Sequence, residues 1–309
     1  MRVNVLSYEP EGGWILYDYA AKLAQHLQPH VQAATVGFRQ AEGHDVTFHV
    51  NYAGLRKIQA PGLHCTMVTH IDSADKFNLV RSQAMAGVWG FCMSEDTARR
   101  LNTLTGLPRF ASFAPPAMLP AEHQRLTVLI AGRLYEDGRK NEPWALDFFR
   151  AFKPQDLVVL VMGAGWEGPL QALQQQGYAV QHVARFDRAL YVDWLRAADH
   201  LLVTGNDEGA LSTLDAMLFG VVPIVTAQGY HLEQQGELIT YATHAQLMAV
   251  AARLQRQLDE THAVCRRLTD WDGFALRHAQ AWRQRLQGVR PEHQAAAQDL
   301  TRQPSKDLP

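Results

Sequence analysis

Apolar residues follow two alternating patterns along this chain. Short, almost continuous apolar runs such as Val3–Ser7, Leu126–Ala131 and Val221–Thr226 are typical of strands that are buried on both faces. Between such runs lie stretches such as Trp14–Leu27, where apolar residues recur at helical spacing and predict a helix with one buried face. Strands and helices therefore alternate, which favours doubly wound parallel sheets with helices on both faces.

The same patterns indicate the remaining elements. Further strands are expected at residues 31–36, 46–50, 65–69, 88–93, 110–113, 156–162, 179–184 and 201–204. Further helices are expected at residues 75–86, 94–104, 141–152, 169–176, 188–198, 212–219, 245–258 and 274–286. Ser94 suits an N-terminal helix cap, and Gly220 suits a C-terminal helix stop.

A proline-rich segment between Pro115 and Pro120 is the predicted linker between two domains. A chain of 309 residues is long enough for two domains of ordinary size. We predict an N-terminal Rossmann-like domain at residues 1–120 and a C-terminal one at residues 121–287. A late helix at residues 271–282 should cross back to the first domain, and the polar tail at 288–309 should be mobile.

Composition and charge exclude several classes of protein. Hydrophobic residues make up 47% of the chain, so a substantial core is expected, and the formal net charge of -2 argues against nucleic acid as a partner. No apolar run approaches the roughly 20 residues of a membrane span, and the N-terminus lacks a signal-peptide core. The three cysteines form no CxxC pair, so we expect reduced thiols, no metal site and a cytoplasmic protein.

The stretch at residues 203–226 carries the strongest candidate chemistry. It reads as a strand, an acidic loop, a helix and a second strand, which puts the loop at the carboxyl edge of a parallel sheet. Backbone N–H groups near Ser212 and Thr213, at the start of the helix, suit a phosphate. The carboxylates of the loop can accept hydrogen bonds from sugar hydroxyls. One loop could therefore hold both halves of a nucleotide sugar.

This stretch resembles the donor-site signature of retaining glycosyltransferases of the GT-B class. The matching residues are Glu208-Gly209, Leu214-Asp215-Ala216-Met217, Gly220 and Val222-Pro223-Ile224-Val225. The resemblance implies that a loop carboxylate holds the donor sugar and that Asp215, in place of the usual Glu, holds the ribose. Glu208 keeps the Glu-Gly pair, whereas Asp207 stands at the family's distance from Asp215, so either can be the sugar ligand.

A second match follows the predicted strand at residues 126–131. The chain continues as Gly132-Arg133-Leu134 and reaches Lys140 shortly before a helix, as in the same family. The resemblance implies that Arg133 and Lys140 hold the donor diphosphate; Arg139 is a neighbour of uncertain role. Two cations can stabilise the charge that develops on a leaving diphosphate without a divalent metal.

Weaker candidates come from four of the remaining loops. Gly12 and Gly13 follow the first strand, and in the resembled family a similar glycine pair faces the donor. His70, after the strand at residues 65–69, resembles a family histidine near the sugar and acceptor; Asp72 is a less favoured neighbour. The family also brings backbone near the nucleotide where Gly163 lies, and places the loop of Arg185 and Phe186 against the base.

The resemblance implies an enzyme with two Rossmann-like domains facing a cleft, which transfers a hexosyl group from a nucleotide diphosphate sugar to a hydroxyl acceptor, with retention. The donor would be a co-substrate, with no other cofactor. Surface polysaccharide assembly, with possible peripheral membrane association, is the setting that the family implies. Three alternatives remain: a GT-B nucleotide-sugar epimerase, a non-catalytic nucleotide-sugar-binding module, and a glycosyltransferase acting on DNA bases, which the net charge disfavours.

Overall fold

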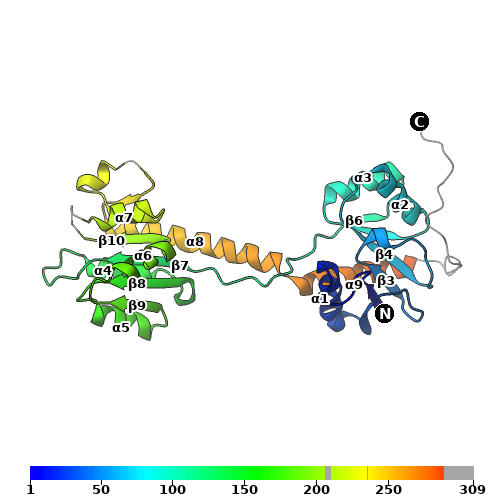
Figure 1. The fold of residues 1–309 in the computed structure, drawn as a ribbon, viewed down its shortest axis with the longest axis horizontal. Coiled ribbons are helices and arrows are strands. Elements are labelled where there is room, and N and C mark those ends of the chain that lie inside the picture. Colours follow the sequence, from blue (N-terminus) through cyan, green and yellow to red (C-terminus); the bar gives the residue numbers. More distant parts are fainter. Residues whose placement is uncertain (206–209, 235, 289–309) are drawn as a thin grey trace. The chain divides into compact units, whose positions relative to one another are not determined.

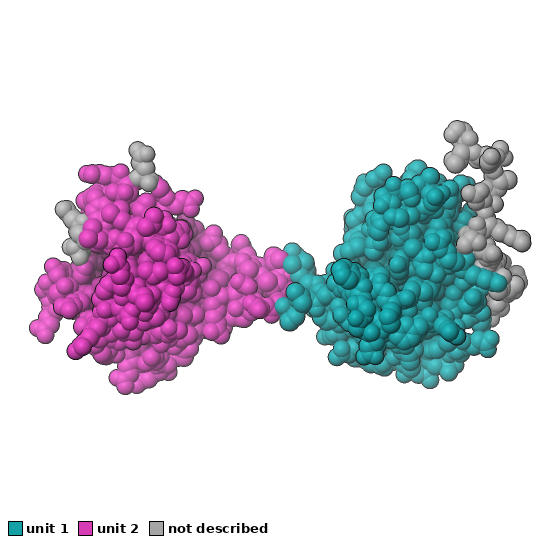
Figure 2. All heavy atoms as spheres, in the orientation of Figure 1, with its two compact units in different colours: residues 1–120, 267–309 teal, residues 121–266 magenta. Residues whose placement is uncertain are grey.

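The computed structural model of the protein describes residues 1–205, 210–234 and 236–288. The chain forms two compact units, as Figure 2 shows. Unit 1 comprises residues 1–120 together with the chain from residue 267 on, and unit 2 comprises residues 121–266. The chain therefore passes between the units twice, after residue 120 and after residue 266.

Unit 1 is built on a six-stranded sheet in which neighbouring strands are all parallel, in the order β2-β1-β3-β4-β5-β6. The strands are β1 (Arg2–Leu6), β2 (Ala33–Gly37), β3 (Val46–His49), β4 (Leu63–Val68), β5 (Trp89–Cys92) and β6 (Phe110–Ser112). The helices are α1 (Ile15–Leu27), α2 (Ala74–Met85), α3 (Glu95–Thr105) and α9 (Trp271–Gly288), with 3-10 turns at Gln28–His30 and Tyr52–Gly54 (Figure 1).

Helices cover both faces of this sheet. Leu23 of α1 and Trp282 of α9 pack on one face, while Val80 of α2 and Leu101 of α3 pack on the other. Trp282 is fully buried, and its ring lies 5.6 Å from that of Phe48 in β3. The late helix thus belongs to the core of unit 1, where a crossover helix was expected from the sequence.

Unit 2 has a second six-stranded parallel sheet, in the order β12-β11-β10-β7-β8-β9. The strands are β7 (Leu126–Ala131), β8 (Leu157–Met162), β9 (Ala179–Val183), β10 (His200–Val203), β11 (Val222–Thr226) and β12 (Ile239–Tyr241). The helices are α4 (Glu142–Arg150), α5 (Glu167–Gln175), α6 (Arg188–Ala197), α7 (Ser212–Leu218) and α8 (His244–Leu268), with 3-10 turns at Pro154–Asp156 and Gly229–Leu232.

Helices again cover both faces, with α4, α5 and α8 on one and α6 and α7 on the other. The strand order of unit 2 reverses between β7 and β10, as in dinucleotide-binding Rossmann sheets. In an open parallel sheet, the loops on either side of such a switch point diverge and leave a crevice at the carboxyl ends of the strands. The prediction of two doubly wound parallel sheets is confirmed.

Two elements of unit 2 differ from the expectation. The short strand β12 was not predicted, because a segment of three residues is too short to carry a periodic signal. Helix α8 continues to Leu268, ten residues beyond the expected end at Leu258. The prediction ended too early because the last turns of the helix are mostly polar and exposed. None of the helices in the described ranges combines the length and the apolar character that a membrane span requires.

Candidate functional site

A cavity of about 230 Å³ lies at the switch point of unit 2, at the carboxyl ends of β7 and β10. It is lined by Ile130, Ala131, Gly132, Arg133, Tyr135, Lys140, Trp166, Leu202, Val203, Thr204, Gly205, Ala210, Leu211 and Ser212. The two segments that resemble glycosyltransferase motifs, which are separated along the chain, therefore line the same cavity.

One side of the cavity depends on close packing between the loops after β7 and β8. Gly163 has a φ of +147°, and a Cβ atom there would stand 2.3 Å from the carbonyl oxygen of Gly132. Only glycine allows this approach. Trp166, 2% exposed, lies beside it, and its Nε1 donates a hydrogen bond of 2.9 Å to the same oxygen. The role of Gly163 that the structure supports is this contact between loops, and Gly163 does not line the cavity.

Hydrogen bonds tie the segment that carries Lys140 to the end of β10. The Thr204 hydroxyl donates to the carbonyl oxygen of Lys140 at 2.6 Å, and Asn141 Nδ2 donates to the carbonyl oxygen of Thr204 at 3.0 Å. Asn141 is held with a φ of 47°, in the left-handed region that non-glycine residues seldom adopt. A Cβ atom on Gly205 would stand 2.9 Å from Lys140 Cδ, so that glycine leaves room for the lysine side chain.

The cavity has a cationic wall. Arg133 is exposed and Lys140 is half-buried, and both line the cavity. The neighbouring Arg139 does not line it; its guanidinium lies 4.0 Å from the centre of the Tyr135 ring and 3.5 Å from an oxygen of Asp137. Two cations beside an open cavity can bind an anionic group such as a phosphate.

The start of α7 is fixed by a buried chain of hydrogen bonds. His231 Nδ1 lies 3.0 Å from the carbonyl oxygen of Thr226, and a carbonyl oxygen only accepts, so Nδ1 carries the proton. In a neutral ring, His231 Nε2 then accepts from the hydroxyl of Thr213 at 3.3 Å. Ser212 lines the cavity, whereas the side chain of Thr213 is fully buried and holds the helix to η4 (Gly229–Leu232).

Asp215 does not line the cavity. Its carboxylate is exposed and accepts a hydrogen bond of 3.2 Å from the hydroxyl of Tyr191 on α6. Burial, and then the charge of Asp215, raise the pKa of Tyr191 well above its ordinary value. The other loop candidates, Asp207, Glu208 and Gly209, lie outside the described residues, so the choice between the two loop carboxylates stays a prediction.

The remaining candidates are not among the residues that line this cavity. Gly12 has a φ of +72°, and Gly13 donates a backbone hydrogen bond of 3.0 Å to the oxygen of Pro10, which closes a tight turn between β1 and α1 in unit 1. In unit 2, Arg185 and Phe186 are exposed after β9 and do not line the cavity. Their predicted contact with the base stays a prediction.

His70 belongs to an exposed group of polar side chains after β4 in unit 1. Its Nε2 atom lies 2.9 Å from Lys76 Nζ and 3.8 Å from an oxygen of Asp72, and its Nδ1 atom lies 2.9 Å from the Thr69 hydroxyl. An ammonium group only donates, so His70 Nε2 is the acceptor and Nδ1 carries the proton. A hydrogen bond from Lys76 lowers the pKa of Asp72.

Two aromatic residues of the site were not among the sequence candidates. Trp166 directly follows the glycine-rich turn after β8, which was a signal that a close contact would form there. Tyr135 stands two residues after Arg133 and presents its ring to Arg139. A tryptophan or a tyrosine at such a position is too common to be identified as a site residue from one sequence.

Comparisons with known proteins found similarity at the level of structure. No family model and no curated protein sequence matches this chain. The chain resembles the catalytic domain of the cholesterol-alpha-glucosyltransferase from Helicobacter pylori, with 18% identity, a TM-score of 0.37 and coverage of 50% of this chain and 99% of that one. It also resembles the lipopolysaccharide outer core galactosyltransferase WaaB, with 11% identity, a TM-score of 0.38 and coverage of 92% of this chain and 100% of that one. A third similar structure is WaaG, a glycosyltransferase involved in lipopolysaccharide biosynthesis, with 15% identity, a TM-score of 0.35 and coverage of 94% of this chain and 100% of that one.

Proposed function

We propose that this protein is a GT-B-type glycosyltransferase that moves a sugar from a nucleotide diphosphate sugar to a hydroxyl acceptor. The observation that carries the proposal is the cavity at the switch point of unit 2. Arg133 and Lys140 reach it from one motif segment, and Gly205 and Ser212 from the other. Both segments are those that the sequence resemblance assigns to the donor.

In this proposal, Arg133 and Lys140 bind the diphosphate and stabilise the charge that grows on it as the glycosidic bond breaks. Such charge stabilisation is typically the largest single contribution to catalysis of this kind. A cavity of about 230 Å³ is smaller than the roughly 300–1,000 Å³ that encloses a whole drug-sized ligand, so it suits one portion of the donor. The donor sugar would be held by Glu208 or Asp207.

Nucleotide binding tests the first half of the proposal. Thermal unfolding of the whole protein is measured against a panel of nucleoside diphosphates and their sugars. A ligand at one hundred times its Kd should stabilise the protein by about 2.7 kcal/mol. Lys140→Ala and Arg133→Ala should lose this shift, whereas Arg139→Ala, a matched cation that does not line the cavity, should keep it. A panel in which no nucleotide shifts unfolding refutes the assignment of the cavity.

Turnover of the identified donor tests the second half. Lys140→Ala should lower the rate about a hundredfold or more, since one charge-assisted contact in the transition state contributes about 3 kcal/mol. We expect the product to keep the anomeric configuration of the donor in NMR spectra and the rate to be independent of added Mg²⁺ or Mn²⁺. Conversion of the donor without any acceptor would instead identify an epimerase, and binding without turnover would identify a non-catalytic module.

A further inference from the structure

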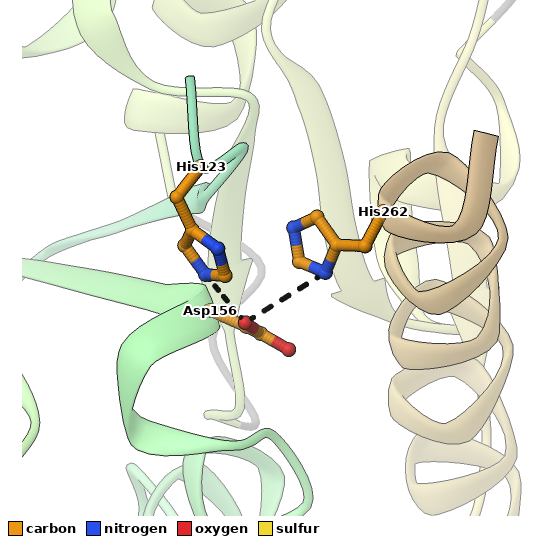
Figure 3. A group of neighbouring side chains, drawn as sticks. All are labelled: His123, Asp156 and His262. Carbon is orange, nitrogen blue, oxygen red and sulfur yellow. Dashed lines mark hydrogen bonds and ion pairs between the residues drawn. The ribbon is translucent and has the colours of Figure 1, made fainter. Parts of the chain in front are cut away.

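A second group of polar side chains lies at the opposite end of the unit 2 sheet, beside the amino ends of its strands. Figure 3 shows His123, Asp156 and His262 pointing toward one another from three separate parts of the chain. His123 lies in the segment that enters β7, Asp156 ends the turn η3 (Pro154–Asp156) before β8, and His262 lies on α8. All three precede or flank the amino ends of the strands, whereas the cationic cavity lies at their carboxyl ends.

The three side chains present a convergent set of ligand atoms. His123 Nε2 lies 2.8 Å from Asp156 Oδ1, and His262 Nδ1 lies 4.0 Å from the same oxygen. One atom from each residue falls within 4.8 Å of the other two. In a tetrahedral Zn²⁺ site with bonds of about 2.0–2.2 Å, ligand atoms stand about 3.3 Å apart. The observed separations bracket that value, and the rings of His123 and His262, which stack with their centres 4.3 Å apart, would rotate about their side-chain bonds to bind one ion.

The hydrogen bonds around His262 fix which nitrogen can act as a ligand. His262 Nε2 lies 2.8 Å from the carbonyl oxygen of Gln124, so it is the donor and Nδ1 of the neutral ring carries the lone pair. That lone pair faces an oxygen of Asp156. Two electron-rich atoms in this relation repel each other unless a cation lies between them. A histidine that donates its second N–H to a backbone carbonyl is the usual arrangement behind a metal ligand.

Asp156 has the surroundings of a ligating carboxylate. The residue is 1% exposed, and its second oxygen, Oδ2, accepts a hydrogen bond of 2.9 Å from Gln255 on α8. Among the described residues, the basic side chains within 4.0 Å of it are the imidazoles of His123 and His262, while the nearby Lys153 pairs with Asp259 instead. A buried carboxylate needs a positive partner, which a bound metal ion would supply.

We propose that His123, Asp156 and His262 form a site for a divalent transition-metal ion of the Zn²⁺ class. Two imidazoles and one carboxylate are ligands that Zn²⁺ accepts, and water can complete the tetrahedron on the side of His123, which is 46% exposed. Metal binding displaces the proton from His123 Nε2, which in the metal-free protein donates to Asp156. This proposal does not depend on the proposed function.

The position of the site indicates a structural role. His123 lies two residues after Ala121, where the chain enters unit 2, and His262 lies four residues before Arg266, where it leaves. A metal ion at this point would link both connecting segments to the start of β8. It would stabilise unit 2 by an amount that depends on the free metal concentration.

Zinc binding to the whole protein tests the proposal. The metal-free protein is titrated with Zn²⁺ by calorimetry, and with Co²⁺ while its visible absorption is recorded. We expect one equivalent of Zn²⁺ to bind and to raise the unfolding temperature of unit 2, and Co²⁺ to give the absorption of a tetrahedral site. In His123→Ala, whose side chain is partly exposed, and in Asp156→Asn, which keeps the carbonyl oxygen that Gln255 contacts, affinity should fall at least about tenfold.

The matched control is His26→Ala in unit 1. His26 Nδ1 also lies 2.7 Å from an aspartate oxygen, of Asp272, but among the described residues no second histidine converges on this pair. His26→Ala should bind Zn²⁺ as the unaltered protein does. If His123→Ala, folded by circular dichroism, binds Zn²⁺ as tightly as His26→Ala does, the site is refuted. A Co²⁺ complex without tetrahedral absorption would likewise refute it.

Discussion

His278 can be used to test whether the core of unit 1 excludes water, because it is a titratable side chain surrounded by aromatic rings. The residue lies on α9 and is fully buried, and its ring stacks at 4.7 Å on Phe113 and at 5.1 Å on Trp282. Neither ring nitrogen has a hydrogen-bond partner among the described residues. Burial, and then the charges of Arg277 and Arg285, lower the pKa of His278 from its ordinary value to about 3.

The sign of the resulting pH dependence follows from proton binding. Between pH values of about 6.5 and 3, the unfolded chain binds a proton at His278 and the folded chain does not. The free energy of unfolding therefore falls as the pH falls below about 6.5. For an ordinary unfolded pKa of about 6.5, this one group costs about 2 kcal/mol at pH 5 and almost nothing at pH 7.5.

The measurement compares the unaltered protein with His278→Leu at pH values of about 7.5 and 5. Guanidinium unfolding is followed by a brief hydrogen-exchange pulse at one fixed pH, and mass spectrometry of peptides from α9 and β3 then reports unit 1 by itself. His49 and His64 also have lowered pKa values through burial, but they contribute to both proteins. We expect His278→Leu to lose about 2 kcal/mol less stability than the unaltered protein between the two pH values.

Phe113→Leu is the matched control, because it alters the same aromatic cluster without removing a titratable group. Its difference in stability from the unaltered protein should be the same at both pH values. If His278→Leu behaves like Phe113→Leu, His278 does not stay neutral on folding, and the account of a dry apolar environment around it is wrong.

Two further predictions concern contacts that support the segments around the unit 2 cavity. Gly163→Ala should lower the free energy of unfolding of unit 2 by about 3 kcal/mol or more, because the added Cβ atom meets a carbonyl oxygen at 2.3 Å. The control is Gly168→Ala, in open space on α5, which should be neutral or stabilising when guanidinium unfolding of unit 2 is measured. Thr213→Val should lower the free energy of unfolding by about 1–3 kcal/mol, because it leaves His231 without its hydroxyl partner. Thr213→Ser keeps that hydrogen bond and should lose less stability. Equal losses in the two variants would show that the hydroxyl does not contribute.

Much of the fold was readable because its strands are buried on both faces. The run at residues 126–131 is apolar enough that both ends of β7 were predicted correctly. Three residues that line the cavity, Arg133, Lys140 and Ser212, were named from the sequence because they stand in short local motifs that follow the ends of strands, and their roles stay predictions. A motif identifies a segment, however, and does not say which way each side chain points. Thr213 shows the difference, since its hydroxyl packs inward on His231.

The histidine and aspartate cluster was not predicted for a related reason. Its three members are widely separated along the chain and stand in no recognisable spacing, so only the packing of α8 against the start of β8 brings them together. The expectation of no metal site rested on the cysteines alone. Helix α8 itself was underestimated, because the turns that carry His262 are mostly polar and exposed.

The two candidate sites of unit 2 should be energetically independent, because one lies at the carboxyl ends of the strands and the other at their amino ends. Strand β8 alone has six residues and so spans about 20 Å, which exceeds the Debye length of about 8 Å at physiological ionic strength. The charge of a bound metal ion should therefore have little effect at Lys140. We expect His123→Ala to keep the nucleotide-induced thermal shift and Lys140→Ala to keep Zn²⁺ binding, each within about 0.5 kcal/mol of the unaltered protein. A larger coupling would mean that the sheet itself adjusts when either site is filled, since direct charge interaction is too weak to link them.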